Sequence, residues 1–146
     1  MARLLHQKHR INGCLMKKIL CVDDDSRMLE LLREALVAKG YSVITTTDPA
    51  EAPEIFGKEN IDLVSLDLDM PVKDGFNLYR ELMTIKPAPV LFVSACSRSF
   101  KASSNEFMDL YQREFQLGQT DLLYKPFVLS LLYDKVESLV GSCAAA

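Results

Sequence analysis

"SLDLDMPVKDG", residues Ser65 to Gly75, is the stretch that decides the fold. It places Asp67 and Asp69 directly after an apolar run, and the turn-forming pairs Met-Pro and Asp-Gly follow them. Two carboxylates at the end of a strand repel each other, so this pattern predicts proton uptake or a bound cation nearby. On this pattern Asp67 could be a structural acid, a metal ligand or a nucleophile.

Apolar runs of strand length alternate with helix-length segments on both sides of this stretch. Continuous apolar or β-branched runs predict five strands, at residues 19–22, 41–46, 61–66, 89–94 and 121–124. Apolar residues at helical spacing predict helices over residues 28–36, 48–56, 75–85, 107–118 and 128–140. Pro53 would interrupt the second helix, which is therefore predicted to be short or to start late. This alternation is typical of an α/β fold, a doubly wound five-stranded parallel sheet with helices on both faces.

Composition and charge limit the class of protein. The 146 residues include 49% apolar and 25% charged side chains, the balance of one ordinary globular domain. Residues 1–16 carry three bases and no acid, which leaves 14 bases against 20 acids, a charge of −6, on the rest of the chain. Residues 17–146 are therefore too acidic to be a good candidate for direct nucleic-acid binding. The longest apolar runs are too short to cross a membrane.

The two ends of the chain differ from its body. We predict one domain over residues 17–141, with residues 1–16 a disordered tail or an upstream extension and residues 142–146 a frayed terminus. The N-terminal segment lacks the sustained apolar core of a secretory signal. Four scattered cysteines without metal-site spacing favour free thiols, as in a cytoplasmic protein.

Polar residues follow or close four of the predicted strands. Asp23 and Asp24 follow the first strand, and Asp67 follows the third. Ser94 closes the fourth strand, and Lys125 follows the fifth. In an open parallel sheet, ligands bind outside the carboxyl ends of the strands, where the strand order reverses. A sheet ordered 2-1-3-4-5 would therefore bring these carboxylates, the hydroxyl and the ammonium group into one pocket.

The charges of this pocket restrict its chemistry. Two unit charges about 4 Å apart interact by roughly 4 kcal/mol at an effective dielectric constant near 20, so clustered carboxylates take up protons or bind a cation. Oxygen-only ligands at a partly open site suit Mg²⁺, which commonly shares its ligand shell with a phosphate. With Mg²⁺ bound, Asp67 could stay ionised and attack phosphorus, while Ser94 and Lys125 hold the phosphoryl oxygens.

Four motifs, in chain order, resemble a known family: "ILCVDDDSRML", "DLVSLDLDMPVKDG", "VLFVSA" and "LLYKPF". Together they closely resemble the receiver domain of two-component response regulators, over about residues 17–140. Each motif alone is a weak signal, but all four in this order at strand ends are specific. The resemblance implies a flavodoxin-like fold and a domain that catalyses only its own phosphorylation and dephosphorylation.

The resemblance also implies a phosphoacceptor and a set of metal ligands. Asp67 is implied as the phosphoacceptor and as a ligand of Mg²⁺. Asp24 would contact the metal directly, and Asp23 would act largely through water. The backbone carbonyl of Asp69 would complete the protein ligands.

The remaining implied roles concern the switch and the partners. Ser94 is implied as the switch hydroxyl, Lys125 as the partner of the phosphoryl group, and Pro126 as the residue after a commonly cis peptide bond. The phosphoryl donor would be a sensor histidine kinase or a phosphotransfer protein in the cytoplasm. A homodimer through the face of the fourth helix is a further possibility, without direct contact to nucleic acid or a membrane.

Three departures from the family pattern change what we expect. Leu122 stands where many receivers carry an aromatic residue that moves together with the switch hydroxyl, so the usual coupling is weakened. Asp69 is acidic where Met or Asn is commoner, and it adds negative charge beside the phosphoryl group. Lys125 follows Ser94 by 31 residues, whereas two short loops and an average helix need about 20. We therefore expect an altered partner surface over residues 95–118.

Three alternatives compete with a phosphorylated receiver. Asp23 to Asp25 could simply cap the helix that follows, because acids stabilise helix N-termini, but beside Asp67 and Lys125 this is the minor explanation. "DLD" after a strand also resembles the nucleophile loop of haloacid-dehalogenase-like phosphohydrolases, although that family carries the motif on its first strand. The third alternative is a degenerate receiver that only binds a partner, and the complete set of acids disfavours it.

Overall fold

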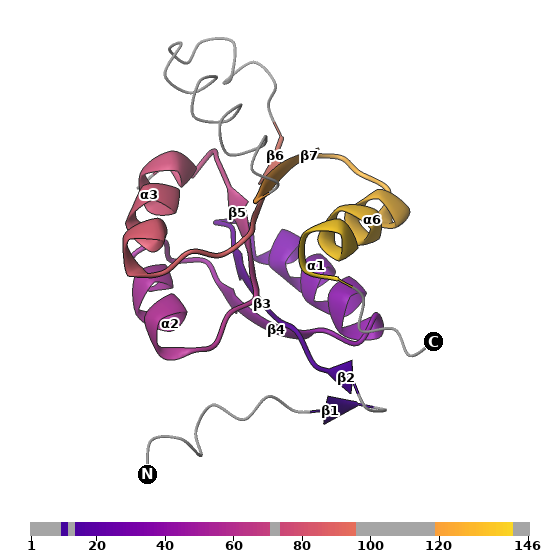
Figure 1. Cartoon of the computed structure of the whole chain (residues 1–146). Helices are drawn as coiled ribbons and strands as arrows, with labels where there is room; N and C mark the ends of the chain where they lie inside the picture. Colours follow the sequence, from indigo (N-terminus) through magenta and orange to yellow (C-terminus); the bar gives the residue numbers. More distant parts are fainter. Residues whose placement is uncertain (1–9, 12–13, 71–73, 96–118, 142–146) are drawn as a thin grey trace.

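A computed structural model describes residues 10–11, 14–70, 74–95 and 119–141 of the chain. Five strands form one parallel sheet: β3 (Lys18–Val22), β4 (Ser42–Thr46), β5 (Leu63–Asp67), β6 (Val90–Ser94) and β7 (Thr120–Tyr124). They are ordered β4-β3-β5-β6-β7 (Figure 1). Because β3 is the first strand of the predicted domain, this is the predicted order 2-1-3-4-5, and the predicted fold class is confirmed.

Helices cover β5 and β6 on both faces of the sheet, which explains why the sequences of these two strands are continuous apolar runs. Every residue of β5 and of β6 is buried. Val22 of β3 lies opposite Leu66 of β5, and Asp67 lies opposite Val93 of β6. This register brings the carboxyl ends of β3, β5 and β6 to the same edge of the sheet.

Helices pack on both faces of the sheet (Figure 1). α1 (Ser26–Ala38) and α6 (Leu129–Val140) cover one face, and α2 (Ala52–Lys58) and α3 (Gly75–Ile85) cover the other. Each face has its own apolar core, because each helix turns one apolar stripe toward the strands. The largest fully buried side chains of these helices are Leu32, Leu36, Phe56, Leu78, Leu82 and Leu132.

Short polar residues, a proline and a glycine set the ends of the helices. Asp25 and Asp74 each accept a hydrogen bond from a backbone N–H in the first turn of α1 and α3, at 3.0 and 2.9 Å. Gly40 follows α1 with φ of +94°, a conformation that favours glycine. Pro53 lies in the first turn of α2, which has only 7 residues, so the predicted short or late second helix is confirmed.

A two-stranded ladder precedes the domain. β1 (Arg10–Ile11) pairs antiparallel with β2 (Cys14–Leu15). The ladder covers only these four residues, and the disordered tail or upstream extension expected over residues 1–16 stays a prediction. The signal that could have predicted the ladder is Asn12-Gly13, because Asn-Gly is a preferred connection of two-residue hairpins.

Several predictions concern parts of the chain outside the described residues. They are the fourth helix over residues 107–118, most of the altered partner surface over residues 95–118, and the frayed terminus over residues 142–146. The homodimer through the fourth-helix face depends on the same region. All of these stay predictions.

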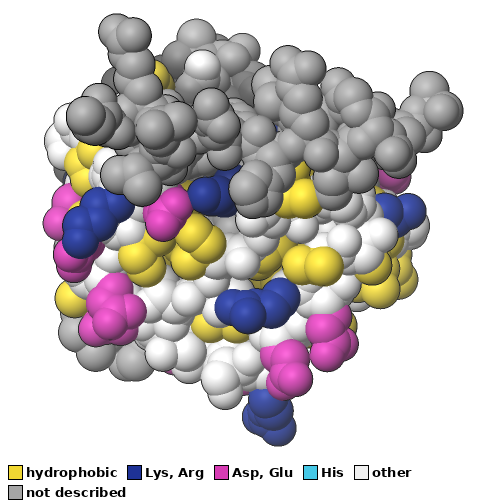
Figure 2. Space-filling model, turned by 90° about the horizontal axis from the view of Figure 1, so that it is seen from below, with side chains coloured by type: hydrophobic (Ala, Val, Ile, Leu, Met, Phe, Trp, Pro, Cys, Tyr) yellow, Lys and Arg dark blue, Asp and Glu magenta, His cyan; other side chains and the backbone are white. Residues whose placement is uncertain are grey.

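One face of the described part of the molecule is mixed in charge. On the face that Figure 2 shows, Lys and Arg side chains lie among Asp and Glu side chains and do not form one continuous basic surface. Among the helices in the described ranges, none has the length and apolar character that a membrane span requires.

Candidate functional site

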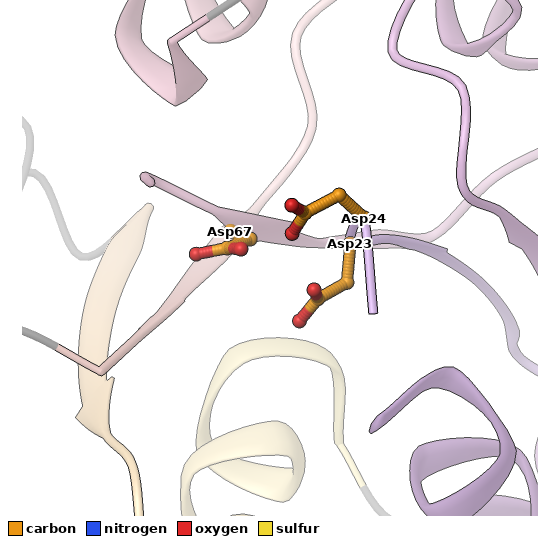
Figure 3. A group of neighbouring side chains, drawn as sticks. All are labelled: Asp23, Asp24 and Asp67. Atoms are coloured by element: carbon orange, nitrogen blue, oxygen red, sulfur yellow. The ribbon is translucent and has the colours of Figure 1, made fainter. Parts of the chain in front are cut away.

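Three carboxylates meet at the carboxyl edge of the sheet. Asp23 follows β3, Asp24 comes next in the chain, and Asp67 ends β5. Each offers a carboxylate oxygen, and these oxygens lie within 4.8 Å of one another (Figure 3). Asp23 and Asp67 are buried, whereas Asp24 is exposed. The structure thus brings together the acids that the sequence places at the ends of the first and third predicted strands.

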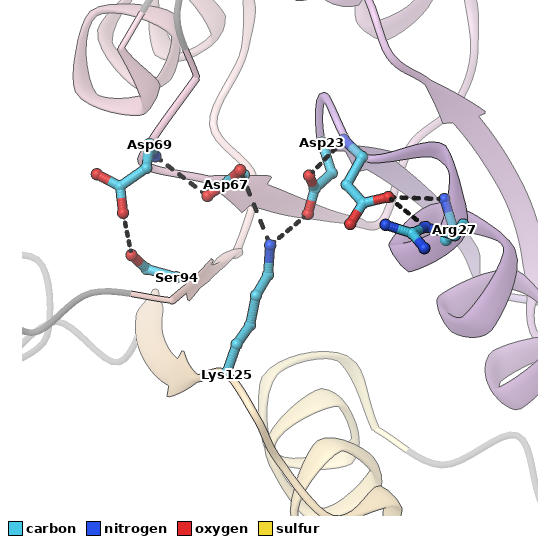
Figure 4. Close-up of polar contacts among 7 residues, drawn as sticks. Asp23, Arg27, Asp67, Asp69, Ser94 and Lys125 are labelled. Atoms are coloured by element: carbon cyan, nitrogen blue, oxygen red, sulfur yellow. Dashed lines mark hydrogen bonds and ion pairs between the residues drawn. The ribbon is translucent and has the colours of Figure 1, made fainter.

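Lys125 places its ammonium group close to both buried carboxylates (Figure 4). Its Nζ donates a 2.7 Å hydrogen bond to Asp23 Oδ2 and lies 3.8 Å from Asp67 Oδ2. The Lys125 side chain is only 14% exposed. Strand pairing positions this lysine, because its backbone N–H donates to the Ser94 carbonyl at 2.8 Å. One ammonium group therefore partly neutralises two buried carboxylates.

Two backbone N–H groups hold the other oxygens of the buried carboxylates. The Asp25 N–H donates to Asp23 Oδ1 at 2.9 Å, and the Asp69 N–H donates to Asp67 Oδ1 at 3.1 Å. In both cases the donor lies two residues after the acceptor, which is the Asx-turn pattern. Each turn fixes Oδ1 and leaves Oδ2 as the oxygen nearer to Lys125.

The charges around Asp67 are unbalanced. Burial raises the pKa of Asp67 to about 6. The hydrogen bond from the Asp69 N–H opposes this shift, the negative charge of Asp23 adds to it, and Lys125 opposes it. When Asp23, Asp24 and Asp67 are all ionised, Lys125 neutralises one of three negative charges, so the cluster has room for a cation.

The donor set fits a divalent cation such as Mg²⁺. All three side chains offer oxygen atoms, which are the ligands that Mg²⁺ prefers. The exposed Asp24 leaves the site open on one side, as suits an ion that keeps several of its waters. Asp23, Asp24 and Asp67 would hold the cation, and the contribution of the Asp69 carbonyl oxygen stays a prediction.

Ser94 makes a contact that the sequence did not predict. It ends β6 and is fully buried, and its Oγ donates a 3.0 Å hydrogen bond to Asp69 Oδ2 (Figure 4). The sequence-based prediction paired Ser94 with the phosphoryl group. For Asp69 it gave a backbone carbonyl that binds Mg²⁺ and a side chain that adds negative charge beside the phosphoryl group. The sequence does show an acid at position 69, but it does not show that this side chain points toward Ser94, because that direction depends on the turn that follows β5.

Leu122 and Pro126 flank the site on β7 and directly after it. Leu122 is half-buried, lies opposite Phe92 of β6, and packs against the core on the α2–α3 face. The Lys125–Pro126 peptide bond is cis, as the resemblance implies. The conformational roles expected of Leu122 and Pro126 stay predictions.

Gly75 brings the start of α3 close to the end of β5. A Cβ at this position would lie 2.5 Å from the carbonyl oxygen of Asp67 and 2.8 Å from the Cα of Leu68. The Gly75 N–H also donates to the Leu68 carbonyl at 3.3 Å. The sequence-based prediction assigned Asp74-Gly75 to a turn and Gly75 to the start of a helix, and residue types alone do not show that this glycine lies against the end of β5.

Gly75→Ala should destabilise the protein by about 1–3 kcal/mol, because the added methyl group meets backbone atoms. Gly57→Ala is the matched control. A Cβ at that position of α2 would meet only a methyl group of Ile85, at 3.9 Å, and alanine is the better helix former. Urea unfolding followed by circular dichroism measures both variants. An unchanged unfolding midpoint for Gly75→Ala would contradict the close approach of α3 to β5.

Comparison with known proteins places the chain among two-component signalling domains. The profile described as "Response regulator receiver domain" matches residues 19–137. The transcriptional regulatory protein GlrR of Escherichia coli (strain K12) is 40% identical over 129 residues, which are 88% of this chain and 27% of that protein. The probable transcriptional regulator ycf27 of Porphyridium aerugineum is 32% identical over 126 residues, which are 85% of this chain and 48% of that protein. The chain therefore spans about half the length, or less, of these curated relatives.

A solved structure agrees with this family. The chemotaxis protein CheY4 of Vibrio cholerae superimposes with a TM-score of 0.70 at 28% identity, over 85% of this chain and 98% of that one. The phosphohydrolase and the purely degenerate receiver are not favoured by these matches. From its strand order, its acidic strand ends and these similarities, the chain belongs to the receiver domain family of two-component response regulators.

Proposed function

We propose that this domain is a phosphorylation-controlled switch in which Asp67 takes a phosphoryl group from a sensor histidine kinase or a phosphotransfer protein in the cytoplasm. The strongest support is the group of Asp23, Asp24 and Asp67 carboxylate oxygens within 4.8 Å of one another. Lys125 Nζ adds to it, 2.7 Å from Asp23 and 3.8 Å from Asp67. In this proposal the domain catalyses only its own phosphorylation and dephosphorylation.

In the proposed transfer, a carboxylate oxygen of Asp67 forms a bond to phosphorus and the phosphorus–nitrogen bond of a phosphohistidine breaks. The imidazole nitrogen of the donor keeps the bonding electron pair, and the product on Asp67 is an acyl phosphate. Asp67 must be ionised to act as the nucleophile. Mg²⁺ held by Asp23, Asp24 and Asp67 would supply charge neutralisation for the anionic donor. The Lys125 ammonium group, already near Asp67 Oδ2, would pair with the phosphoryl oxygens.

Phosphorylation of Asp67 would change the conformation of the neighbouring strands β6 and β7, beginning at their carboxyl ends. Ser94 ends β6 and is the hydroxyl proposed to respond to the phosphoryl group. Leu122 on the neighbouring strand β7 is aliphatic and half-buried against the core. We therefore propose that Ser94 carries the response without the aromatic partner that is common in this family.

Intact-mass measurement after incubation with Mg²⁺ and acetyl phosphate tests the proposed function. We expect one added phosphate, and hydroxylamine should remove it, because hydroxylamine cleaves acyl phosphates and leaves phosphate esters of serine intact. Omission of Mg²⁺ should strongly reduce the incorporation. Rapid turnover of many phosphate esters, with no phosphorylated protein detected, would contradict the proposal and favour a phosphohydrolase.

A further inference from the structure

We propose that Asp69 is a positioning residue that holds the Ser94 hydroxyl group in the unphosphorylated protein and must release it before Ser94 can contact a phosphoryl group on Asp67. The inference rests on the proposed function of Asp67. It assigns to the Asp69 side chain a role in opposing the phosphorylated state.

The hydrogen bonds of Asp69 connect the phosphoacceptor to the switch hydroxyl. Its backbone N–H donates to Asp67 Oδ1 at 3.1 Å, and its carboxylate Oδ2 accepts from Ser94 Oγ at 3.0 Å (Figure 4). Ser94 is fully buried. A serine hydroxyl has a single proton to donate, so this proton cannot serve the Asp69 carboxylate and a phosphoryl oxygen at the same time.

The contact between Ser94 and Asp69 is of a strong kind. A hydrogen bond to an ionised carboxylate is roughly twice as strong as one between neutral groups, and it strengthens away from water. A phosphoryl group on Asp67 would therefore compete with an acceptor that is already in place. Its negative charge would also be repelled by the Asp69 carboxylate. Competition for the hydroxyl and charge repulsion both oppose phosphorylation, and only the first requires Ser94.

Titration with beryllofluoride in the presence of Mg²⁺ separates these two effects. Beryllofluoride is an analogue of the phosphoryl group, and isothermal titration calorimetry measures its affinity. The four proteins to compare are the parent, Asp69→Ala, Ser94→Ala and the double variant. Asp69→Ala keeps the backbone N–H and carbonyl of residue 69, and we expect it to tighten binding at least about tenfold. In the Ser94→Ala background the same substitution should also tighten binding, because it still removes the charge repulsion. The factor of tightening should be smaller than in the parent, by at least about threefold, because there is no Ser94 hydroxyl group to release.

Two further variants identify the cause of the tightening. Asp69→Asn keeps an oxygen that can accept from Ser94 but removes the charge, so its affinity should lie between those of the parent and Asp69→Ala. Asp134→Ala removes one charge from an exposed position on α6 and should bind beryllofluoride like the parent. Urea unfolding without ligand gives an independent measure, in which Asp69→Ala and Ser94→Ala should be non-additive because they break one hydrogen bond.

The possible outcomes distinguish this inference from the proposed function. Equal tightening by Asp69→Ala in the parent and in the Ser94→Ala background would overturn it, because repulsion alone would then explain the effect. Unchanged or weaker binding of beryllofluoride by Asp69→Ala would overturn it as well. If the parent itself fails to bind beryllofluoride with Mg²⁺, the proposed function fails and this inference fails with it.

Discussion

Asp67→Asn should abolish phosphorylation by acetyl phosphate and Mg²⁺ while leaving the fold intact. An asparagine amide has the shape of the carboxylate, and its oxygen can still accept the hydrogen bond that the Asp69 N–H now donates at 3.1 Å. The amide cannot form an acyl phosphate by attack on phosphorus. Intact-mass measurement should show no added phosphate, and circular dichroism should match the parent. Asp134→Asn, at an exposed position of α6, is the control and should be phosphorylated like the parent.

The same substitution should raise the stability of the metal-free protein at neutral pH. Burial raises the pKa of Asp67 to about 6, from 3.8 in an ordinary environment. Between these two values the folded state binds the proton and the unfolded state does not, so stability falls as pH rises through this window. One pKa unit corresponds to about 1.4 kcal/mol, so Asn should add about 1–3 kcal/mol above pH 6.

Urea unfolding at pH 4 and at pH 7.5, without metal, checks this stability effect. The gain of Asp67→Asn over the parent should be small at pH 4 and largest at pH 7.5. Mg²⁺ should narrow the gap, because it stabilises the parent through a carboxylate that the variant lacks. Asp134→Asn should differ from the parent by no more than about 0.5 kcal/mol at either pH. A constant difference between Asp67→Asn and the parent across pH would contradict the raised pKa.

Asp24→Ala and Lys125→Ala should affect Mg²⁺ binding in different ways. Asp24 is an exposed member of the cluster, and its removal should weaken Mg²⁺ binding at least about tenfold. Changing a residue that only supports a metal ligand already costs about 10–100-fold in metal affinity, so loss of a direct ligand should cost no less. Lys125 is cationic and cannot be a ligand of Mg²⁺. Lys125→Ala should therefore leave Mg²⁺ affinity largely intact while it disturbs the consequences of phosphorylation. Calorimetric titration with Mg²⁺ measures both affinities.

Thermal unfolding with and without Mg²⁺ adds a second readout. Without metal, Lys125→Ala should destabilise the protein by about 3 kcal/mol, because it leaves the buried Asp23 and Asp67 without their ammonium partner. Because its Mg²⁺ affinity should be largely intact, the rise in Tm on adding Mg²⁺ should be close to that of the parent. In Asp24→Ala that rise should be small. If Mg²⁺ binds Asp24→Ala as it binds the parent, the carboxylates after β3 only cap α1.

Much of the fold was predictable because each strand is bounded by residues with one clear physical role. The buried runs that became β5 and β6 are continuous and apolar, and both are covered by helices. Their ends shifted slightly: the third strand was predicted at residues 61–66, whereas β5 covers Leu63–Asp67. Such shifts do not move the site, because the register pairs Val22 with Leu66 and Asp67 with Val93 and so keeps the carboxyl ends of these strands together.

The parts of the site that were missed depend on loop geometry. Asp23 and Asp67 could be placed because each stands at a strand end. The side chain of Asp69 lies beyond β5, and its contact with Ser94 depends on a turn whose direction the residue types alone do not determine. The same holds for Gly75, which follows Asp67 by eight residues in the sequence but lies close to the Asp67 carbonyl oxygen in space.

Mapping the phosphorylated residue tests the central claim most directly. The parent is phosphorylated with acetyl phosphate and Mg²⁺ and reduced with borohydride, which converts an aspartyl phosphate to homoserine, and its peptides are then analysed by mass spectrometry. We predict homoserine at position 67 and at no other aspartate, because a 2.7 Å hydrogen bond from Lys125 holds Asp23 Oδ2, whereas Asp67 Oδ2 lies 3.8 Å from that ammonium group. Conversion of Asp23, Asp24 or Asp69 instead, or a borohydride-resistant phosphate on Ser94, would contradict the account.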